Sequence, residues 1–98
     1  MASLSGLLPE LQPYADLLVR NMPGAIVTSV YRSPTEQLEL YRNRARNKYP
    51  VAPPGRSYHE YRRAFDVVAD LAVLKWAGSV WRSWGGQWFA SDPIHFQA

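Results

Sequence analysis

The sequence predicts a small α+β domain in which a short antiparallel sheet is flanked by about three helices. Helical and strand-like segments are intermingled, without the regular alternation of a doubly wound sheet. The apolar fraction of 47% and the aromatic fraction of 13% are sufficient to build a hydrophobic core. The length of 98 residues is typical of one domain, so we expect residues 1–98 to form a single domain.

Three segments have the apolar spacing and the end signals of helices. They cover residues 8–22, 33–47 and 70–84. The second is the best marked, because Ser33 suits an N-cap and Glu36 completes a capping box. Asp70 is the expected N-cap of the third helix, which Gly85–Gly86 ends.

Four short segments rich in β-branched, apolar and aromatic residues are predicted strands. They cover residues 25–32, 63–69, 87–90 and 93–97. Asp66 interrupts the second of them, where an ionised carboxylate costs several kcal/mol unless it is paired or bound to a metal. The alternative is that this is an edge strand, on which Asp66 faces water or an arginine.

Composition excludes several classes of protein. The chain has no cysteine, so neither a disulfide framework nor a thiolate ligand or nucleophile is available. No apolar run approaches the roughly 18 residues that span a bilayer, and we expect neither membrane insertion nor a signal peptide. The net charge of +3 suits polyanionic surroundings, such as nucleic acid or a bacterial wall, without identifying either.

The two histidines of the chain, His59 and His95, each lie close to an aspartate in sequence. Asp66 follows His59 by seven residues. On one helix this interval would separate the two residues by about 10.5 Å, and on one strand it would place their side chains on opposite faces. The chain must therefore turn at residues 60–63 if both side chains are to reach one metal. With His95 they offer two imidazoles and one carboxylate, the three protein ligands of a catalytic zinc site. Asp92 could hold a water and take its proton, although each of these residues taken singly is more often structural.

At these residues the sequence resembles a known family. The segments SYHEYRRAFD at residues 57–66 and DPIHFQ at residues 92–97 are similar to the zinc peptidases of the D-alanyl-D-alanine carboxypeptidase and L-alanyl-D-glutamate endopeptidase family. Members cleave the peptide part of bacterial peptidoglycan, and many phage endolysins are among them. The family pattern is matched at Ser57, His59, Ala64, Asp66, Asp92 and His95. The resemblance extends to Arg32 and Gln37 and covers roughly residues 25–98.

The resemblance implies a role for each matched residue. His59, Asp66 and His95 would bind zinc, with the site at the sheet. Asp92 would be the general base and then the general acid. Arg32 would hold the substrate or stabilise an oxyanion near the scissile carbonyl; its alternative interpretation is a surface arginine that follows a strand.

Three further residues are candidates for substrate binding. Gln37 and Ser57 would support the ligands or the substrate, and their alternatives are helix surface and loop capping. Arg62 stands where the family has a glycine in the turn after the first histidine. A positive φ there would strain an arginine. The side chain could instead reach into the cleft and change substrate choice, which is the interpretation we favour, or it could mark a decayed site.

The remaining conspicuous residues have structural interpretations. The tryptophans are expected to lie in the core and in the cleft wall, with sugar stacking as the alternative: Trp76, Trp81, Trp84 and Trp88. Residues 42–49, RNRARNKY, are interpreted as a solvated helix end. The alternative for this basic run is attachment to an anionic wall or to nucleic acid.

Three classes of function follow. We expect a zinc peptidase that acts on peptidoglycan stem peptides in phage- or prophage-type wall lysis, either released at lysis or carried on a virion. A catalytically inert, zinc-stabilised binding module is the alternative, and the presence of Asp92 favours the enzyme over it. A nucleic-acid binder is disfavoured, because the aromatic residues do not interleave with the basic run as stacking platforms would.

Overall fold

The computed structural model describes residues 2–98, which form one antiparallel sheet and three α-helices, as the sequence predicts. The helices are α1 (Gln12–Arg20), α2 (Pro34–Arg42) and α3 (Leu71–Ser83). The strands are β1 (Ile26–Ser29), β2 (Ala64–Val68), β3 (Gln87–Trp88) and β4 (His95–Gln97). Three short 3₁₀ helices complete the order: η1 (Leu4–Gly6), η2 (Arg44–Arg46) and η3 (Tyr58–Tyr61). In the described residues no helix is both long and apolar enough to cross a membrane.

The strands are ordered β1-β2-β4-β3, so β2 lies inside the sheet between β1 and β4. The alternative that Asp66 lies on an edge strand is therefore wrong. Along β2 the side chains alternate between the two faces of the sheet. Phe65 and Val67 are buried in the hydrophobic core, whereas Asp66 points to the other face, where the functional site lies.

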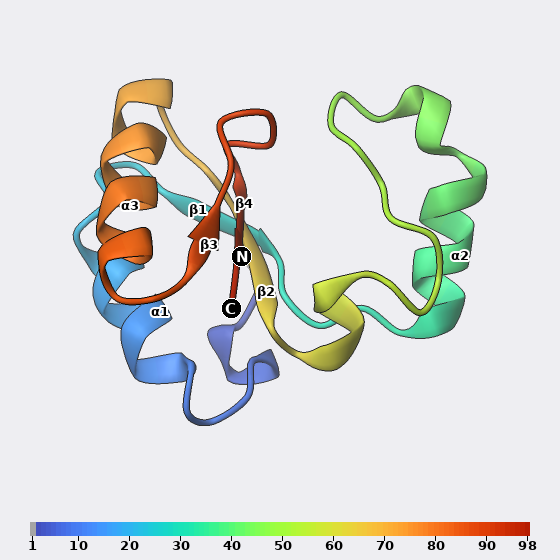
Figure 1. Cartoon of the computed structure of the whole chain (residues 1–98), viewed down its shortest axis with the longest axis horizontal. Coiled ribbons are helices and arrows are strands. Elements are labelled where there is room, and N and C mark those ends of the chain that lie inside the picture. Colours follow the sequence, from blue (N-terminus) through green and yellow to red (C-terminus); the bar gives the residue numbers. More distant parts are fainter. Residues whose placement is uncertain (1) are drawn as a thin grey trace.

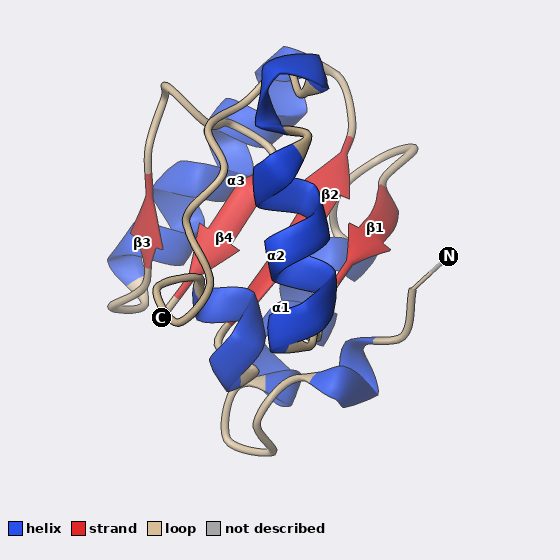
Figure 2. Ribbon diagram, turned by 90° about the vertical axis from the view of Figure 1, so that its right-hand side faces the viewer, coloured by secondary structure: helices blue, strands red, loops and turns tan. Residues whose placement is uncertain are grey.

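Helices α1 and α3 lie together beside the sheet, and α2 lies apart from them (Figure 1). Seen from the side, α2 stands in front of the sheet and α3 behind it (Figure 2). Leu18 of α1 and Leu74 and Trp81 of α3 belong to the hydrophobic core between these two helices and the sheet. The segment 33–57, which we call the α2 lobe, thus faces the side of the sheet that carries Asp66.

Most elements are shorter than the sequence suggests. Helix α1 begins at Gln12, because Pro13 occupies its first turn. Helix α2 has the predicted capping box of Ser33 and Glu36 but ends at Arg42, where a 3₁₀ turn follows. Asp70 is the N-cap residue of α3, as predicted, although its side chain makes no capping hydrogen bond.

The tryptophans divide into two pairs. Trp81 and Trp88 are buried, as predicted. Trp76 and Trp84 are 48% and 40% exposed and neither lines the main cleft, so the prediction is wrong for them. The buried positions of α3 include Leu74 and Ala77, and Trp76 lies between them on the outward side of the helix.

Candidate metal centre

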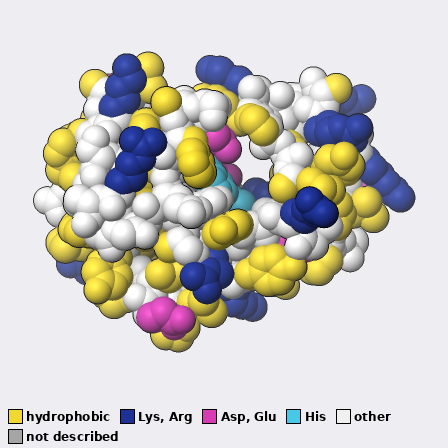
Figure 3. Space-filling model, viewed as in Figure 1, with side chains coloured by type: hydrophobic (Ala, Val, Ile, Leu, Met, Phe, Trp, Pro, Cys, Tyr) yellow, Lys and Arg dark blue, Asp and Glu magenta, His cyan; other side chains and the backbone are white. Residues whose placement is uncertain are grey.

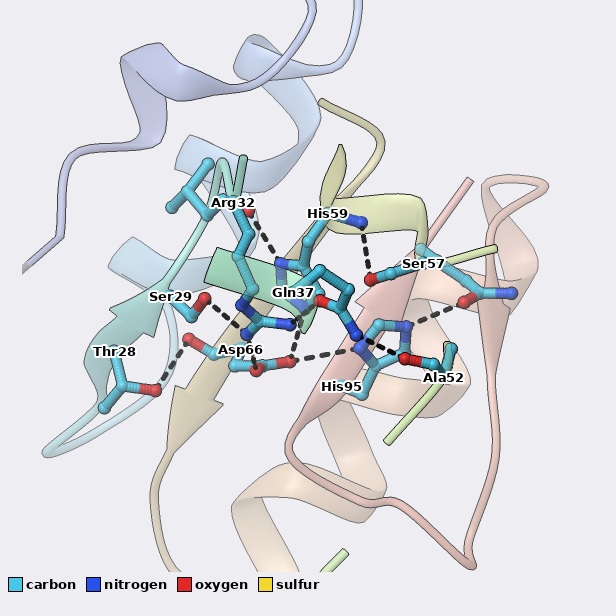
Figure 4. A network of polar contacts seen from close by, with 11 residues as sticks. Thr28, Ser29, Arg32, Gln37, Ala52, Ser57, His59, Asp66 and His95 are labelled. Carbon is cyan, nitrogen blue, oxygen red and sulfur yellow. Dashed lines mark hydrogen bonds and ion pairs between the residues drawn. The ribbon is translucent and has the colours of Figure 1, made fainter. Parts of the chain in front are cut away.

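Three side chains from three elements converge on one point. His59 comes from η3, Asp66 from β2 and His95 from β4, and one ligand atom from each lies within 4.8 Å of the others. The Nε2 atom of His59 and the Nδ1 atom of His95 are each 3.1 Å from Oδ1 of Asp66. Figure 4 shows both rings directed at this carboxylate. The group could hold a metal ion.

A tight turn brings His59 back over the strand that carries Asp66. The side chain of Ser57 accepts a hydrogen bond from the backbone N–H of His59, and Glu60 completes a capping box with Ser57. The 3₁₀ helix ends at Arg62, whose φ of 59° is left-handed. Strand β2 begins two residues later. The turn therefore falls within residues 60–63, where the spacing of the two ligands required it.

Asp66 and His95 are neighbours because of the sheet register. They are direct partners in the antiparallel pairing of β2 with β4. Side chains of directly opposed residues lie on the same face with their Cβ atoms roughly 4.5–5.5 Å apart. The hydrogen-bonded ladder itself therefore holds two of the three ligand groups together.

The outer nitrogen of each imidazole is already hydrogen-bonded. Nδ1 of His59 lies 2.6 Å from the carbonyl oxygen of Val30, and Nε2 of His95 lies 2.7 Å from Oε1 of Gln97. Both partners are acceptors, so each outer nitrogen donates an N–H. In the neutral rings the inner nitrogens consequently present lone pairs to the carboxylate of Asp66. Three acceptors that face one another need a shared cation, and this donor set fits a divalent metal such as zinc.

The pKa shifts of Asp66 and His95 also indicate that a positive charge is favoured among the three ligand groups. Burial alone would raise the pKa of Asp66, but hydrogen bonds from His59 and His95 outweigh it and hold that pKa well below its usual range. Burial alone would lower the pKa of His95, but the hydrogen bond to Asp66 and the charge of that carboxylate, with smaller contributions from Gln97 and Asp92, together outweigh burial and raise it. A positive charge beside the Asp66 carboxylate is thus favoured.

Arg32 and Gln37 form a polar bridge from the carboxylate to the α2 lobe. One guanidinium nitrogen of Arg32 donates to Ser29 Oγ at 2.9 Å and lies 3.8 Å from Oδ2 of Asp66. The other donates to Oε1 of Gln37 at 2.8 Å. Gln37 is 1% exposed, so it is not a helix-surface residue, and its amide donates to the carbonyl of Ala52 at 2.6 Å. Arg32 is accordingly oriented toward the metal centre.

Asp92 lies in the turn before β4 and lines the same cleft as the three ligand groups. Its backbone carbonyl accepts from the N–H of His95 at 3.0 Å, and its own N–H donates to Phe89. Burial raises the pKa of its carboxyl group. Asp92 is not part of the metal-binding group itself, so its carboxylate remains available for other chemistry.

Arg62 lies elsewhere than expected. Its guanidinium stacks on the ring of Tyr31, 4.1 Å from the ring centroid, and donates to the carbonyl of Gly6 at 3.2 Å. It does not line the cleft. The structure therefore gives no support to Arg62 as a substrate-binding residue, because its side chain packs against the N-terminal segment. Ser57, by contrast, lines the cleft and also caps the helix that carries His59.

The cleft has a volume of about 690 Å³ and separates the sheet from the α2 lobe. Figure 3 shows a hollow between two parts of the molecule, with histidine at its base and acidic side chains at its upper edge. The walls come from the α2 lobe on one side and from the loop before β4 on the other. A peptide can thus approach the three ligand groups from solvent.

Gln97 contacts the His95 ring, and our interpretation of the sequence omits it. Its side chain accepts from His95 and donates to Oε1 of Gln87 at 2.7 Å. The available signal is strand periodicity, since Gln97 follows His95 by two residues and so shares its face of β4. The Val30 carbonyl that holds His59 has no such signal, because it is a backbone atom distant in sequence.

No protein-family model and no curated protein matches this sequence. Solved structures do match. A mutant of the vancomycin resistance D,D-pentapeptidase VanY in complex with Zn(II) is 21% identical, with a TM-score of 0.69 over 93% of this chain and 71% of that one. The L,D-carboxypeptidase DacB from Streptococcus pneumonia is 20% identical, with a TM-score of 0.71 over 94% and 66%. The LdcB LD-carboxypeptidase is 21% identical, with a TM-score of 0.72 over 94% and 65%. The chain spans about two thirds of these structures, and it has the fold of these peptidases, as its His–Asp and Asp–His motifs predicted.

Proposed function

We propose that this protein is a zinc-dependent peptidase that hydrolyses peptide bonds in the stem peptides of bacterial peptidoglycan. The observation that carries the proposal is the convergence of three metal-ligand groups at the base of an open cleft. Asp92 lines the same cleft, and its carboxylate is not part of the metal-binding group. Structural zinc sites are closed by four protein ligands, whereas catalytic sites have three and keep one position open. The solved neighbours support the substrate class, since the LdcB structure concerns peptidoglycan recognition and VanYB has been solved in complex with D-Alanine-D-Alanine.

In this proposal His59, Asp66 and His95 hold the zinc. A zinc ion in such a site supplies Lewis acidity, which polarises a carbonyl and makes water more acidic. The chain contributes the orientation of the ligands. The carbonyl of Val30 fixes the His59 ring and the amide of Gln97 fixes the His95 ring, so that each presents its inner nitrogen.

Asp92 is the proton-transfer group. It takes a proton from the attacking water and later gives it to the leaving amine, which regenerates the carboxylate. The raised pKa of Asp92 brings its two protonation states closer in energy near neutral pH, as a group with both tasks requires. Arg32 contacts the substrate near the scissile carbonyl, in the orientation that Ser29 and Gln37 impose.

The finer biological proposal is wall lysis of the phage or prophage type. It is supported by the resemblance of both motifs to a family that includes many endolysins. Release at lysis and carriage on a virion are the two routes by which such a chain reaches the wall. The exact bond is either the terminal peptide bond, as in a carboxypeptidase, or an internal one, as in an endopeptidase.

The decisive experiment compares three variants on purified peptidoglycan, with products identified by mass spectrometry. Asp92→Ala should retain zinc and lose roughly 10²–10⁴-fold in turnover, the usual contribution of general acid–base catalysis. His95→Ala should lose both zinc and activity. Asp70→Ala is the matched control, because Asp70 is exposed and makes no capping bond, and it should resemble the parent.

The same experiment separates the enzyme from an inert zinc-stabilised module. A parent protein that binds zinc stoichiometrically but releases no peptide from any peptidoglycan chemotype would be such a module. An Asp92→Ala variant that cleaves as fast as the parent would show that Asp92 is only a turn residue, and the mechanism would be wrong.

A further inference from the structure

The net positive charge of the chain lies in the α2 lobe. Residues 33–57 contain five Lys or Arg and two Glu, whereas the rest of the chain contains six of each sign. Both acids of the lobe have local partners, since Glu36 caps α2 and Glu39 accepts from Asn43. Figure 3 shows several dark blue side chains on the right-hand part of the molecule, to which this lobe belongs, and others elsewhere on this face. The lobe therefore presents cations that its own acids do not neutralise.

Two of these cations, Lys48 and Arg56, line the cleft. Both are exposed, and within residues 2–98 neither forms an ion pair. Arg32, the remaining basic side chain of the cleft wall apart from the histidines, is already bonded to Ser29 and Gln37. Lys48, whose ammonium lies 5.5 Å from the ring centroid of Tyr49, and Arg56 are thus the cleft cations that no acidic side chain neutralises.

We propose that Lys48 and Arg56 bind a substrate carboxylate that lies away from the scissile bond, so that the cleft selects acidic peptides. This inference rests on the proposed peptidase function and specifies its substrate. A carboxylate is the complementary group, because Arg and Lys donate charge-assisted hydrogen bonds to it. A long polyanion would instead engage the other exposed cations of the lobe, Arg42, Arg44 and Arg46, which lie outside the cleft. The position of Lys48 and Arg56 along the cleft favours a bound acidic peptide over such a polyanion.

The test uses a synthetic stem peptide whose glutamate α-carboxylate is either free or amidated. The parent should cleave the free acid with the lower KM. The double variant Lys48→Gln, Arg56→Gln should lose this preference, with KM for the free acid rising roughly two- to fivefold for each ion pair removed. The value of kcat and the KM for the amidated peptide should change little. The preference of the parent should also shrink as salt is raised.

The matched control is the double variant Arg42→Gln, Arg46→Gln, which removes the same charge from the same lobe outside the cleft. It should retain the preference of the parent. Equal losses in the two double variants would mean that net charge attracts the peptide, and the proposed site would be wrong. An unchanged preference in Lys48→Gln, Arg56→Gln would overturn the proposal as well.

Binding is measured separately, by calorimetry on the zinc-loaded Asp92→Ala protein with and without the two cleft substitutions. A preference for the free acid that vanishes with Lys48 and Arg56 supports the binding site even if the parent cleaves neither peptide, in which case the proposed peptidase function fails alone. If the Asp92→Ala protein binds both peptides with equal affinity, the proposed carboxylate site is wrong. The peptidase function is then tested independently by the digestion of peptidoglycan.

Discussion

Arg62 allows the cost of a strained turn to be measured beside a ligand group. Within residues 2–98 it is the one non-glycine residue with a positive φ, at 59°. It follows the 3₁₀ helix that carries His59, and it also makes contacts of its own with Tyr31 and Gly6. Substituting Arg62 by alanine removes the contacts and keeps the strain. Substituting it by glycine removes both, so the difference between the variants isolates the backbone contribution.

The magnitudes follow from the contacts. A cation–π pair at an exposed site is worth about 0.5–1 kcal/mol, and the hydrogen bond to Gly6 about 0.5–1.5 kcal/mol. Arg62→Ala should therefore reduce the free energy of unfolding by about 1–2.5 kcal/mol. A left-handed backbone conformation costs an alanine about 1–2 kcal/mol, and glycine avoids this cost. The greater freedom of glycine in the unfolded chain offsets about 0.4–1 kcal/mol of that advantage. Arg62→Gly should thus be more stable than Arg62→Ala by about 0.5–1 kcal/mol.

The assay is urea unfolding of the zinc-loaded parent and both variants, supported by melting curves. For a domain of this size 1 kcal/mol corresponds to roughly 4–8 °C in Tm. Equal stability of the glycine and alanine variants would refute the left-handed turn. A change in peptide preference in Arg62→Gly, with stability unchanged, would refute the placement of this side chain outside the cleft and restore the role that the sequence suggested.

Three further outcomes test the centre and the core. Zinc at 100 times its Kd should add about 2.7 kcal/mol to stability, which a chelator removes, because the ion binds the folded chain; a Tm indifferent to both would refute the metal site. Gln97→Leu should weaken zinc binding about 10–100-fold by freeing the His95 ring, while Gln97→Glu, which keeps an acceptor, should bind zinc much more tightly than the leucine variant in a competition titration. Gly78→Ala should lower the free energy of unfolding by about 1–3 kcal/mol, since overpacked cores are destabilised: its Cβ would lie 2.2 Å from the Trp88 ring. The exposed neighbour substitution Ser79→Ala should be near neutral by the same urea assay, and a stabilised Gly78→Ala would contradict the packing.

The sequence predicted the α+β fold from local patterns, and it predicted the convergence of the three ligand groups from their residue types and from the resemblance of the two motifs to a peptidase family. The interval between His59 and Asp66 is incompatible with a regular helix or strand, so a turn was required, and capping residues marked the helix starts. Gln97 could also have been identified, since a period of two places it beside His95 on one face. The turn, the helix starts and the position of Gln97 need only the geometry of a single segment.

The errors concern partners that are distant in sequence. The position of the Arg62 side chain depends on Gly6, which is 56 residues away, and spacing along the chain carries no information about that contact. Strand order likewise decides that Asp66 is internal rather than at an edge. The exposure of Trp76 is different, because the buried positions of α3 follow the helical period, which could have excluded it.

The direct pairing of Asp66 with His95 links metal binding to the choice of strand alignment during folding. A slip of β4 by one residue would turn its side chains to the opposite face and separate the two ligand groups. An ion that binds only the correct alignment lowers the free energy of that alignment alone, by mass action. Short strands specify their alignment weakly by themselves, and β4 has three residues. Metal binding would therefore increase the population of chains with the correct strand alignment, even when no substrate is present.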